Sequence, residues 1–278
     1  MKLLTLFILS IFLISGCTSK EKLKKNYLTK YKLQENVKSL KEITYKAEDK
    51  FGTIIKSDVE WGNYSLFDNR GNRIETNDYY PDGRIERKFI YKYDNQGNEI
   101  EGNRYKSDGS LDGKWIDQND LRGNMIERIY YRSDGRIEDK NTYHYDDIGN
   151  QIEDNWYTSD GSLHQKMTYK YDNEGNKIEH NYYKSDGSLE EKVIYQYDSH
   201  RNLVEVNEYK SDGSNCGKRT YKYDKIGNVI EAEEYSSKHT TYKYIYQYDN
   251  KNNWIQEIQL WNDIPKYISE RTIEYYEK

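Results

Sequence analysis

The fold of this chain is decided by the 26 residues 172–197, which read DNEGNKIEHNYYKSDGSLEEKVIYQY. This stretch recurs along the chain at a nearly constant spacing, and an aspartate marks each copy: Asp68, Asp94, Asp120, Asp146, Asp172, Asp198, Asp224 and Asp249. A fixed period of this length is typical of a supersecondary unit that stacks on its neighbours. The sequence therefore predicts an array of repeated units rather than a globule built around one active site.

Two turn signals divide each copy. The pair Asp186-Gly187 predicts a two-residue type I′ hairpin turn, in which both central positions need positive φ. The second signal, Asp-x-x-Gly-Asn, predicts a loop of about four residues. Each copy then forms one β-hairpin, so about eight repeats predict an all-β fold with roughly 16 strands in an antiparallel β-meander or solenoid. We expect this array to remain an open sheet, either single-layered or coiled on itself.

The tight turn sets the strand register, and the register separates two faces. Asn181 is expected opposite Lys192. One face then carries isoleucine and tyrosine columns, and the other carries glutamate and lysine columns. Because tyrosine combines a rigid ring with a hydroxyl, we predict that its face binds a partner. The candidate binding residues are the tyrosine pairs of four copies: Tyr143, Tyr145, Tyr169, Tyr171, Tyr195, Tyr197, Tyr221 and Tyr223.

The first residues carry a targeting signal. An apolar run from Leu3 to Leu13 has the length of a signal-peptide core and is too short to span a bilayer. The segment Ile14-Ser15-Gly16-Cys17 resembles the lipobox of bacterial lipoproteins. That resemblance implies cleavage before Cys17, a lipid on its thiol, and attachment to the cell membrane or outer membrane, facing away from the cytoplasm.

The chain divides into three predicted parts. Residues 1–16 form a lipoprotein signal peptide, residues 17–36 a lysine-rich tether, and residues 37–278 the hairpin-repeat domain. The tether reads as a solvated spacer, with a weak amphipathic helix as the alternative. With Cys17 lipidated, Cys216 has no partner for a disulfide.

Composition narrows the function. Hydrophobic residues make up 35% and charged residues 33% of the chain, which alone would suggest disorder, but 31 tyrosines in a strict period favour strands. A net charge of −5 gives no basic footprint, so we do not expect nucleic acid as a partner. No zinc-protease, nucleophile-elbow or phosphate-loop motif is present, and the five histidines share no ligand spacing. We therefore expect no enzyme activity, metal or cofactor.

The tyrosine-aspartate and glycine-asparagine signature, as in residues 169–176, resembles the YD repeats of the RHS family over about residues 64–256. In that family the repeats form a sheet that spirals into a hollow shell around a toxin domain. This chain has fewer copies, and the residues after Asn253 resemble closing strands rather than a toxin. The third copy departs from the pattern, with Asp117-Gln118-Asn119-Asp120 in place of its tyrosines. We therefore do not expect a closed shell.

These patterns favour a non-catalytic, lipid-anchored envelope protein whose tyrosine-rich face binds glycan or protein. A structural spacer is the simplest version of this hypothesis. The RHS resemblance leaves a toxin-associated shell or immunity protein as an alternative. A hydrolase acting on polysaccharide is the remaining alternative, and it would require two carboxylates in a deep pocket.

Overall fold

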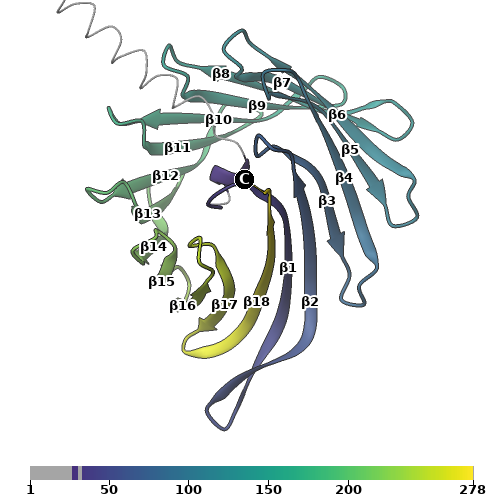
Figure 1. The fold of residues 1–278 in the computed structure, drawn as a ribbon. Coiled ribbons are helices and arrows are strands. Elements are labelled where there is room, and N and C mark those ends of the chain that lie inside the picture. The colour runs from purple at the N-terminus through teal and green to yellow at the C-terminus, as the bar shows by residue number, and fades with distance from the viewer. Residues whose placement is uncertain (1–26, 31–32, 278) are drawn as a thin grey trace, which may run out of the picture.

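The computed structural model describes residues 27–30 and 33–277 as one antiparallel β-sheet with a short helix (Figure 1). The predictions for the signal peptide and Cys17 lie outside these residues. The elements are α2 (Tyr27–Lys30), β1 (Val37–Lys50), β2 (Thr53–Phe67), β3 (Arg73–Tyr79), β4 (Ile85–Tyr93), β5 (Glu99–Lys106), β6 (Leu111–Asn119), β7 (Met125–Arg132), β8 (Ile137–Tyr145), β9 (Gln151–Thr158), β10 (Leu163–Tyr171), β11 (Lys177–Lys184), β12 (Leu189–Tyr197), β13 (Leu203–Lys210), β14 (Asn215–Tyr223), β15 (Val229–Tyr235), β16 (His239–Tyr248), β17 (Trp254–Trp261) and β18 (Ile264–Tyr275).

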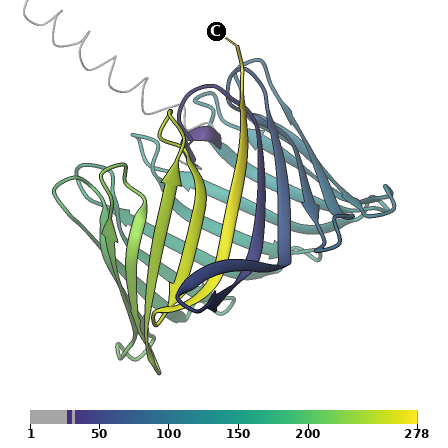
Figure 2. The ribbon, with the colours of Figure 1, turned by 60° about the horizontal axis from the view of Figure 1, so that its bottom comes forward.

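The sheet is closed, and the expectation of an open meander or solenoid is wrong. Each of its 18 strands pairs with the strands before and after it, and β1 pairs with both β2 and β18 (Figure 2). The result is an antiparallel β-barrel. An open sheet would leave two edge strands with unpaired backbone groups, and closure removes both edges.

The pairing of β1 with β18, here called the seam, explains why the ring closes. These strands are 14 and 12 residues long, whereas the strands of the regular repeats have seven to nine. Across the seam the hydroxyls of Thr44 and Ser269 lie 2.8 Å apart, and Arg271 Nε donates to Glu42 Oε2 at 2.7 Å. The terminal strands thus have side chains that specify each other as partners.

The hairpin turns differ from the predicted type. Gly187 has φ of 82°, but Asp186 does not have positive φ, so this is not a type I′ turn. Gly187 N–H donates to the Lys184 carbonyl and Lys184 N–H donates to the Ser188 carbonyl, at 2.9 and 3.0 Å. This is a three-residue loop ending on a left-handed glycine. A bulge beyond the turn restores the register, and Asn181 lies opposite Lys192 as predicted.

The Asp-x-x-Gly-Asn turns at the other end of the strands are held by the aspartate. Asp172 Oδ1 accepts hydrogen bonds from the Glu174 and Asn176 backbone N–H groups, and its Oδ2 accepts one from Asn176 Nδ2. Tyrosines then link successive repeats: Tyr197 Oη donates to the Lys177 carbonyl at 2.9 Å. The same bond joins Tyr93 to Arg73, Tyr145 to Met125, Tyr171 to Gln151 and Tyr223 to Leu203.

The inside of the barrel is identified by α2, which lies within the ring in Figure 1. Leu28 of this helix belongs to the main buried apolar cluster, together with Leu33, Val37, Leu40 and Phe67. The face that carries Leu40 and Phe67 is therefore the inner wall. None of the helical segments in the described part of the chain has the length and apolar character needed to cross a membrane.

Candidate functional site

The outer wall is a charged ladder that repeats almost unchanged. Glu179 accepts from Lys170 at 2.8 Å, from Lys192 at 3.1 Å and from Asn181 Nδ2 at 2.8 Å. Burial opposes ionisation, but these hydrogen bonds outweigh it and lower the pKa of Glu179 to about 2. Other copies repeat the arrangement: Glu75 with Lys88 and Asn77, Glu153 with Lys166 and Asn155, and Glu205 with Lys218 and Asn207. Exposed pairs add little stability each, so the ladder mainly specifies register and hydrates the outer surface.

The inner wall is aromatic and varies from copy to copy. All five tryptophans of the chain lie on it: Trp61, Trp115, Trp156, Trp254 and Trp261. Position 180, a histidine in the fifth copy, is arginine at 128, aspartate at 154 and valine at 206. The copies therefore share one outer wall, whereas the inner wall differs around the ring.

The side chains of the inner wall do not fill the barrel. Trp61 and Trp261 are 41% and 37% exposed, and apart from the buried Tyr91 the inner tyrosines are half-buried. A tightly packed interior would bury such rings completely. Barrels of about 16–18 strands are in general wide enough to leave space inside. The aromatic surface is thus open to a ligand that enters the ring.

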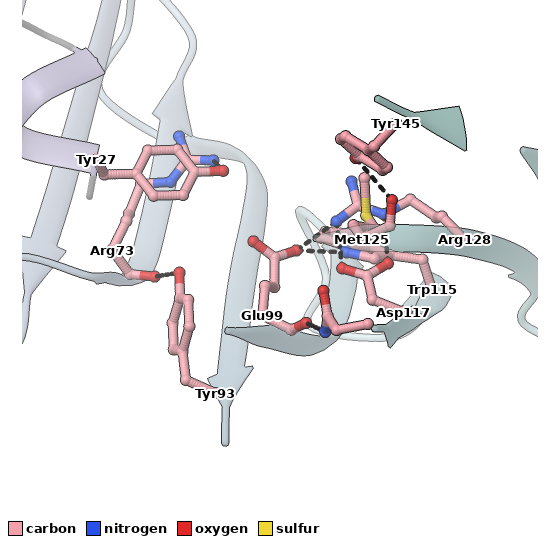
Figure 3. A network of polar contacts seen from close by, with 10 residues as sticks. Tyr27, Arg73, Tyr93, Glu99, Trp115, Asp117, Met125, Arg128 and Tyr145 are labelled. Atoms are coloured by element: carbon pink, nitrogen blue, oxygen red, sulfur yellow. Dashed lines mark hydrogen bonds and ion pairs between the residues drawn. The ribbon is translucent and has the colours of Figure 1, made fainter. Parts of the chain in front are cut away.

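One sector of the inner wall carries a buried polar network (Figure 3). Arg128 donates to both oxygens of Asp117, at 2.6 and 2.5 Å, and to Glu99 at 2.8 Å. Trp115 Nε1 donates to the same Glu99 oxygen at 2.7 Å. Burial raises the pKa of Glu99, although Arg128 opposes the shift. These groups satisfy one another, so the network holds this sector of the wall together.

A second sector of the inner wall buries two polar side chains that make fewer hydrogen bonds than those of the first. Asp154 and His180 are 8% and 6% exposed, and within the described part of the chain Asp154 Oδ1 and His180 Nε2 have no hydrogen-bond partner. Burial raises the pKa of Asp154 to about 6. Burial, with the charge of Lys177, lowers the pKa of His180 to about 4. The His180 ring packs between Tyr169 and Tyr182, with centroids 4.6 and 4.1 Å apart.

The eight candidate binding tyrosines all lie on the inner wall. They separate into two rows with different surroundings. In the row Tyr145, Tyr171, Tyr197 and Tyr223, each hydroxyl donates to a backbone carbonyl of the preceding copy. The other row consists of Tyr143, Tyr169, Tyr195 and Tyr221. Each of these tyrosines lies two residues before its partner on the same face of the strand, and its ring is half-buried. The second row is therefore better placed to contact a ligand.

Sequence reasoning did not single out Asp117 and Arg128 as partners. Asp117 occupies the position where other copies have an inward tyrosine, and this substitution was visible as the irregularity of the third copy. The signal for the buried network is thus a departure from the repeat. Asp154 and His180 carried a similar signal, since each differs from its counterparts in the other copies.

Two cavities adjoin the first strands of the barrel. The larger, of about 420 Å³, lies on the outer wall over Gly62, between Tyr64 and Tyr79. The smaller, of about 240 Å³, lies on the inner wall at the seam, and Arg73, Arg271 and Trp61 are among the residues that line it. Within residues 27–30 and 33–277, no cluster of three or more histidine, cysteine, aspartate or glutamate side chains is arranged to hold a metal ion.

A family model described only as an uncharacterised protein matches residues 111–222, which is less than half of the chain. No curated protein matches. Among solved structures, the chain is similar to a porin-like protein from Bacteroides uniformis, at 12% identity and a TM-score of 0.47, over 87% of this chain and 98% of that one.

Two further solved structures are more distant. A Photorhabdus luminescens Tc holotoxin pore gives 12% identity and a TM-score of 0.30, over 83% of this chain and 16% of that one. A LolA superfamily protein from Nitrosomonas europaea gives 10% identity and a TM-score of 0.22, over 88% of both chains. With TM-scores this low, none of the three likenesses carries an argument about function.

Proposed function

We propose that this chain is a non-catalytic, lipid-anchored envelope protein that binds a glycan on the aromatic inner wall of its barrel. The observation that carries the proposal is that all five tryptophans and two repeated tyrosine rows lie on the inside of a closed ring, whereas the outer wall carries no tryptophan and a tyrosine row within its charged ladder. Sugar rings stack on aromatic faces, and hydroxyl groups at the edges of tyrosine give hydrogen bonds. The outer wall, by contrast, presents the charged ladder.

Closure of the ring favours a glycan over a folded protein as the partner. A folded protein would have to dock on a face that now lies inside the barrel, whereas a glycan chain is much narrower than a folded protein. A toxin-associated shell would need the same interior for another polypeptide, and α2 already occupies part of it. The hydrolase alternative would require two carboxylates in one pocket. Each of the two cavities described above is lined by a single carboxylate, Glu42, so neither supports this alternative.

A glycan array probed with the full-length protein in detergent tests the binding. Tyr195→Ala should weaken the glycan found there by about three- to tenfold, since one aromatic contact is worth roughly 1 kcal/mol. Tyr183→Ala is the matched control, because Tyr183 belongs to the same hairpin and projects from the outer wall. No binding to any glycan would overturn the proposal. Equal losses in both variants would move the site away from the inner wall.

The lipid anchor is tested separately at Cys17. Cys17→Ser should abolish incorporation of labelled fatty acid and release the protein from the membrane fraction, because this thiol is the predicted attachment point. Cys216→Ser should leave the labelling unchanged. Label retained on the Cys17 variant would show that the lipobox resemblance is misleading.

A further inference from the structure

The larger cavity lies where the outer wall departs from its repeat. Gly62 of β2 stands opposite Tyr79 of β3. At the later junctions of the same kind, the residue opposite the equivalent tyrosine is a lysine: Lys88, Lys114, Lys140, Lys166, Lys192 and Lys218. Lys114 Nζ, for example, lies over the ring of Tyr131, 5.4 Å from its centroid. Gly62 has no side chain to cover Tyr79, so the cavity takes the place of the lysine.

Three further departures from the repeat supply the walls of this cavity. Tyr64 stands where later copies have isoleucine or threonine: Ile90, Ile116, Thr142, Thr168, Ile194 and Thr220. Tyr80 and Pro81 stand where the other copies with an Asp-Gly turn have lysine, arginine or threonine followed by serine. Tyr64, Tyr80 and Pro81 all line the cavity, together with Tyr79. The charged outer wall is thus replaced here by a hollow with tyrosine and proline walls.

The cavity is also lined by an amide with an unused acceptor. Asn77 is 6% exposed, and its Nδ2 donates to Glu75 Oε1 at 2.8 Å. Its Oδ1 has no hydrogen-bond partner within the part of the chain that the structure describes. A buried acceptor that lacks a donor is costly to the fold. An N–H or O–H group of a ligand at this oxygen would remove that cost.

The lining charges disfavour an ionic ligand. Lys41 lines the cavity and would repel a cation, while Glu42, the lining carboxylate, already accepts from Arg271. An anion is disfavoured because the faces of tyrosine rings carry partial negative charge. A ligand of this cavity is therefore expected to be uncharged.

The size and the polar groups of the cavity define the rest of the ligand. Its volume of about 420 Å³ falls within the roughly 300–1,000 Å³ of pockets for small molecules. A sugar would bring several hydroxyls, whereas the cavity offers one buried oxygen that lacks a donor. We infer that this cavity binds a small, flat, uncharged aromatic compound with one N–H or O–H donor, its ring against the tyrosines and its donor on Asn77. The site lies on the wall opposite to the glycan surface and does not depend on the proposed function.

Indole and 1-methylindole test the donor, because a methyl group replaces the N–H of indole in the second compound. Isothermal titration of the full-length protein in detergent measures both affinities, with protein-free micelles as the blank. Indole should bind about fivefold more tightly, as expected for one hydrogen bond. Asn77→Ile should abolish this preference. The repeat itself carries isoleucine at the equivalent position, Ile129, so the substitution suits the fold.

Gly62→Lys tests the cavity, because it restores the lysine of the repeat. It should weaken indole binding at least tenfold by filling the space over Tyr79. A Cβ built on Gly62 lies 3.6 Å from its nearest neighbours, which is ordinary contact, so the strand accepts the side chain. Lys114→Gly, the reverse exchange, is the matched control and should leave indole binding unchanged, because the space that it opens lacks the tyrosine and proline walls.

Tyr80→Lys provides a second variant at a position that is 39% exposed, where a substitution is unlikely to disturb the fold. It should weaken indole binding about threefold, through the loss of one aromatic wall.

The opposite results are equally clear. Failure of indole and 1-methylindole to bind would overturn the inference, and unchanged indole binding in Gly62→Lys would refute this cavity as the site. Equal affinity for the two compounds would refute the hydrogen bond to Asn77. Tighter binding of benzylammonium than of indole would overturn the assignment of an uncharged ligand. None of these results bears on glycan binding at the inner wall, which the glycan array tests separately.

Discussion

Asp154 is buried on the inner wall, and its contribution to the stability of the fold depends on pH. Its pKa is raised to about 6 by burial, and the paired residue across the strand, Tyr143, offers no cation. The unfolded chain binds this proton with the ordinary pKa of 3.8. A folded pKa above the unfolded one contributes stability that is complete below pH 3.8 and is lost as the pH rises through about 6.

Asp154→Asn should therefore stabilise the protein at pH 8 and change it little at pH 4. The expected gain at pH 8 is roughly 1–3 kcal/mol, since the substitution removes a buried charge and keeps the shape. Urea denaturation at both pH values measures the effect. Asp139→Asn is the control, because Asp139 lies on the same wall and is less buried. A loss of stability at pH 8 would mean that the carboxylate has a partner.

The tyrosine hydroxyls that join successive copies should matter individually. Tyr197→Phe removes the bond from Tyr197 Oη to the Lys177 carbonyl and is expected to cost about 1 kcal/mol of unfolding free energy. Tyr183→Phe, on the outer wall, is the comparison and should cost less than half as much. Denaturant midpoints of the two variants decide the question, and equal shifts would contradict an inter-repeat role for this hydroxyl.

At the scale of the hairpin, the turn glycine should matter more for stability than an exposed residue at the bulge. Gly187 has φ of 82°, and a Cβ built there would meet no atom within 4 Å. Any loss caused by Gly187→Val therefore comes from backbone strain, which is worth about 1–2 kcal/mol. Glu190 is exposed, so Glu190→Ala should change stability by less than about 0.5 kcal/mol. Similar, small changes in both variants would mean that the turn is not held in the left-handed conformation.

The hairpins were predictable from sequence because their determinants are local. The Asp-Gly and Asp-x-x-Gly-Asn signals lie within a few residues of the backbone that they bend, and the register that follows is confirmed by Asn181 opposite Lys192. The turn type was wrong because an extra loop residue is cancelled by the bulge next to Glu190, so both turn geometries give the same register. The sequence pattern specifies register more strongly than it specifies the turn.

At the scale of the whole molecule, closure was not predictable by the same reasoning. The bond between Thr44 and Ser269 joins residues 225 positions apart, and no periodic signal marks them as partners. Closure also decides which face of the sheet becomes the interior, because an open sheet would leave both faces accessible. The buried network and the seam cavity exist only inside the closed ring, so the site was less predictable than the strands.

The seam should be the point at which the ring is most easily opened by mutation. Glu42→Lys places a third cation beside Arg271 and should destabilise the fold by about 3 kcal/mol or more, as expected for breaking a buried ion pair. Opened rings would expose two strand edges and self-associate. Size-exclusion chromatography with light scattering measures this. Glu231→Lys, at a more exposed position of the outer ladder, should remain monodisperse like the unmodified protein, and equal behaviour of the two variants would contradict a special role for the seam.

The constant outer ladder has a consequence for the width of the barrel. Each copy pairs with its neighbours through the same columns, so removal of residues 172–197 would join β10 to β13 through side chains of the kinds already present at that junction. Each copy contributes two strands, and the diameter of a barrel grows roughly linearly with strand number. The bore of such a ring therefore changes in steps of two strands. Gene duplication or deletion within this chain would thus change the bore of the ring, while substitutions on the inner wall would change the surface that lines it.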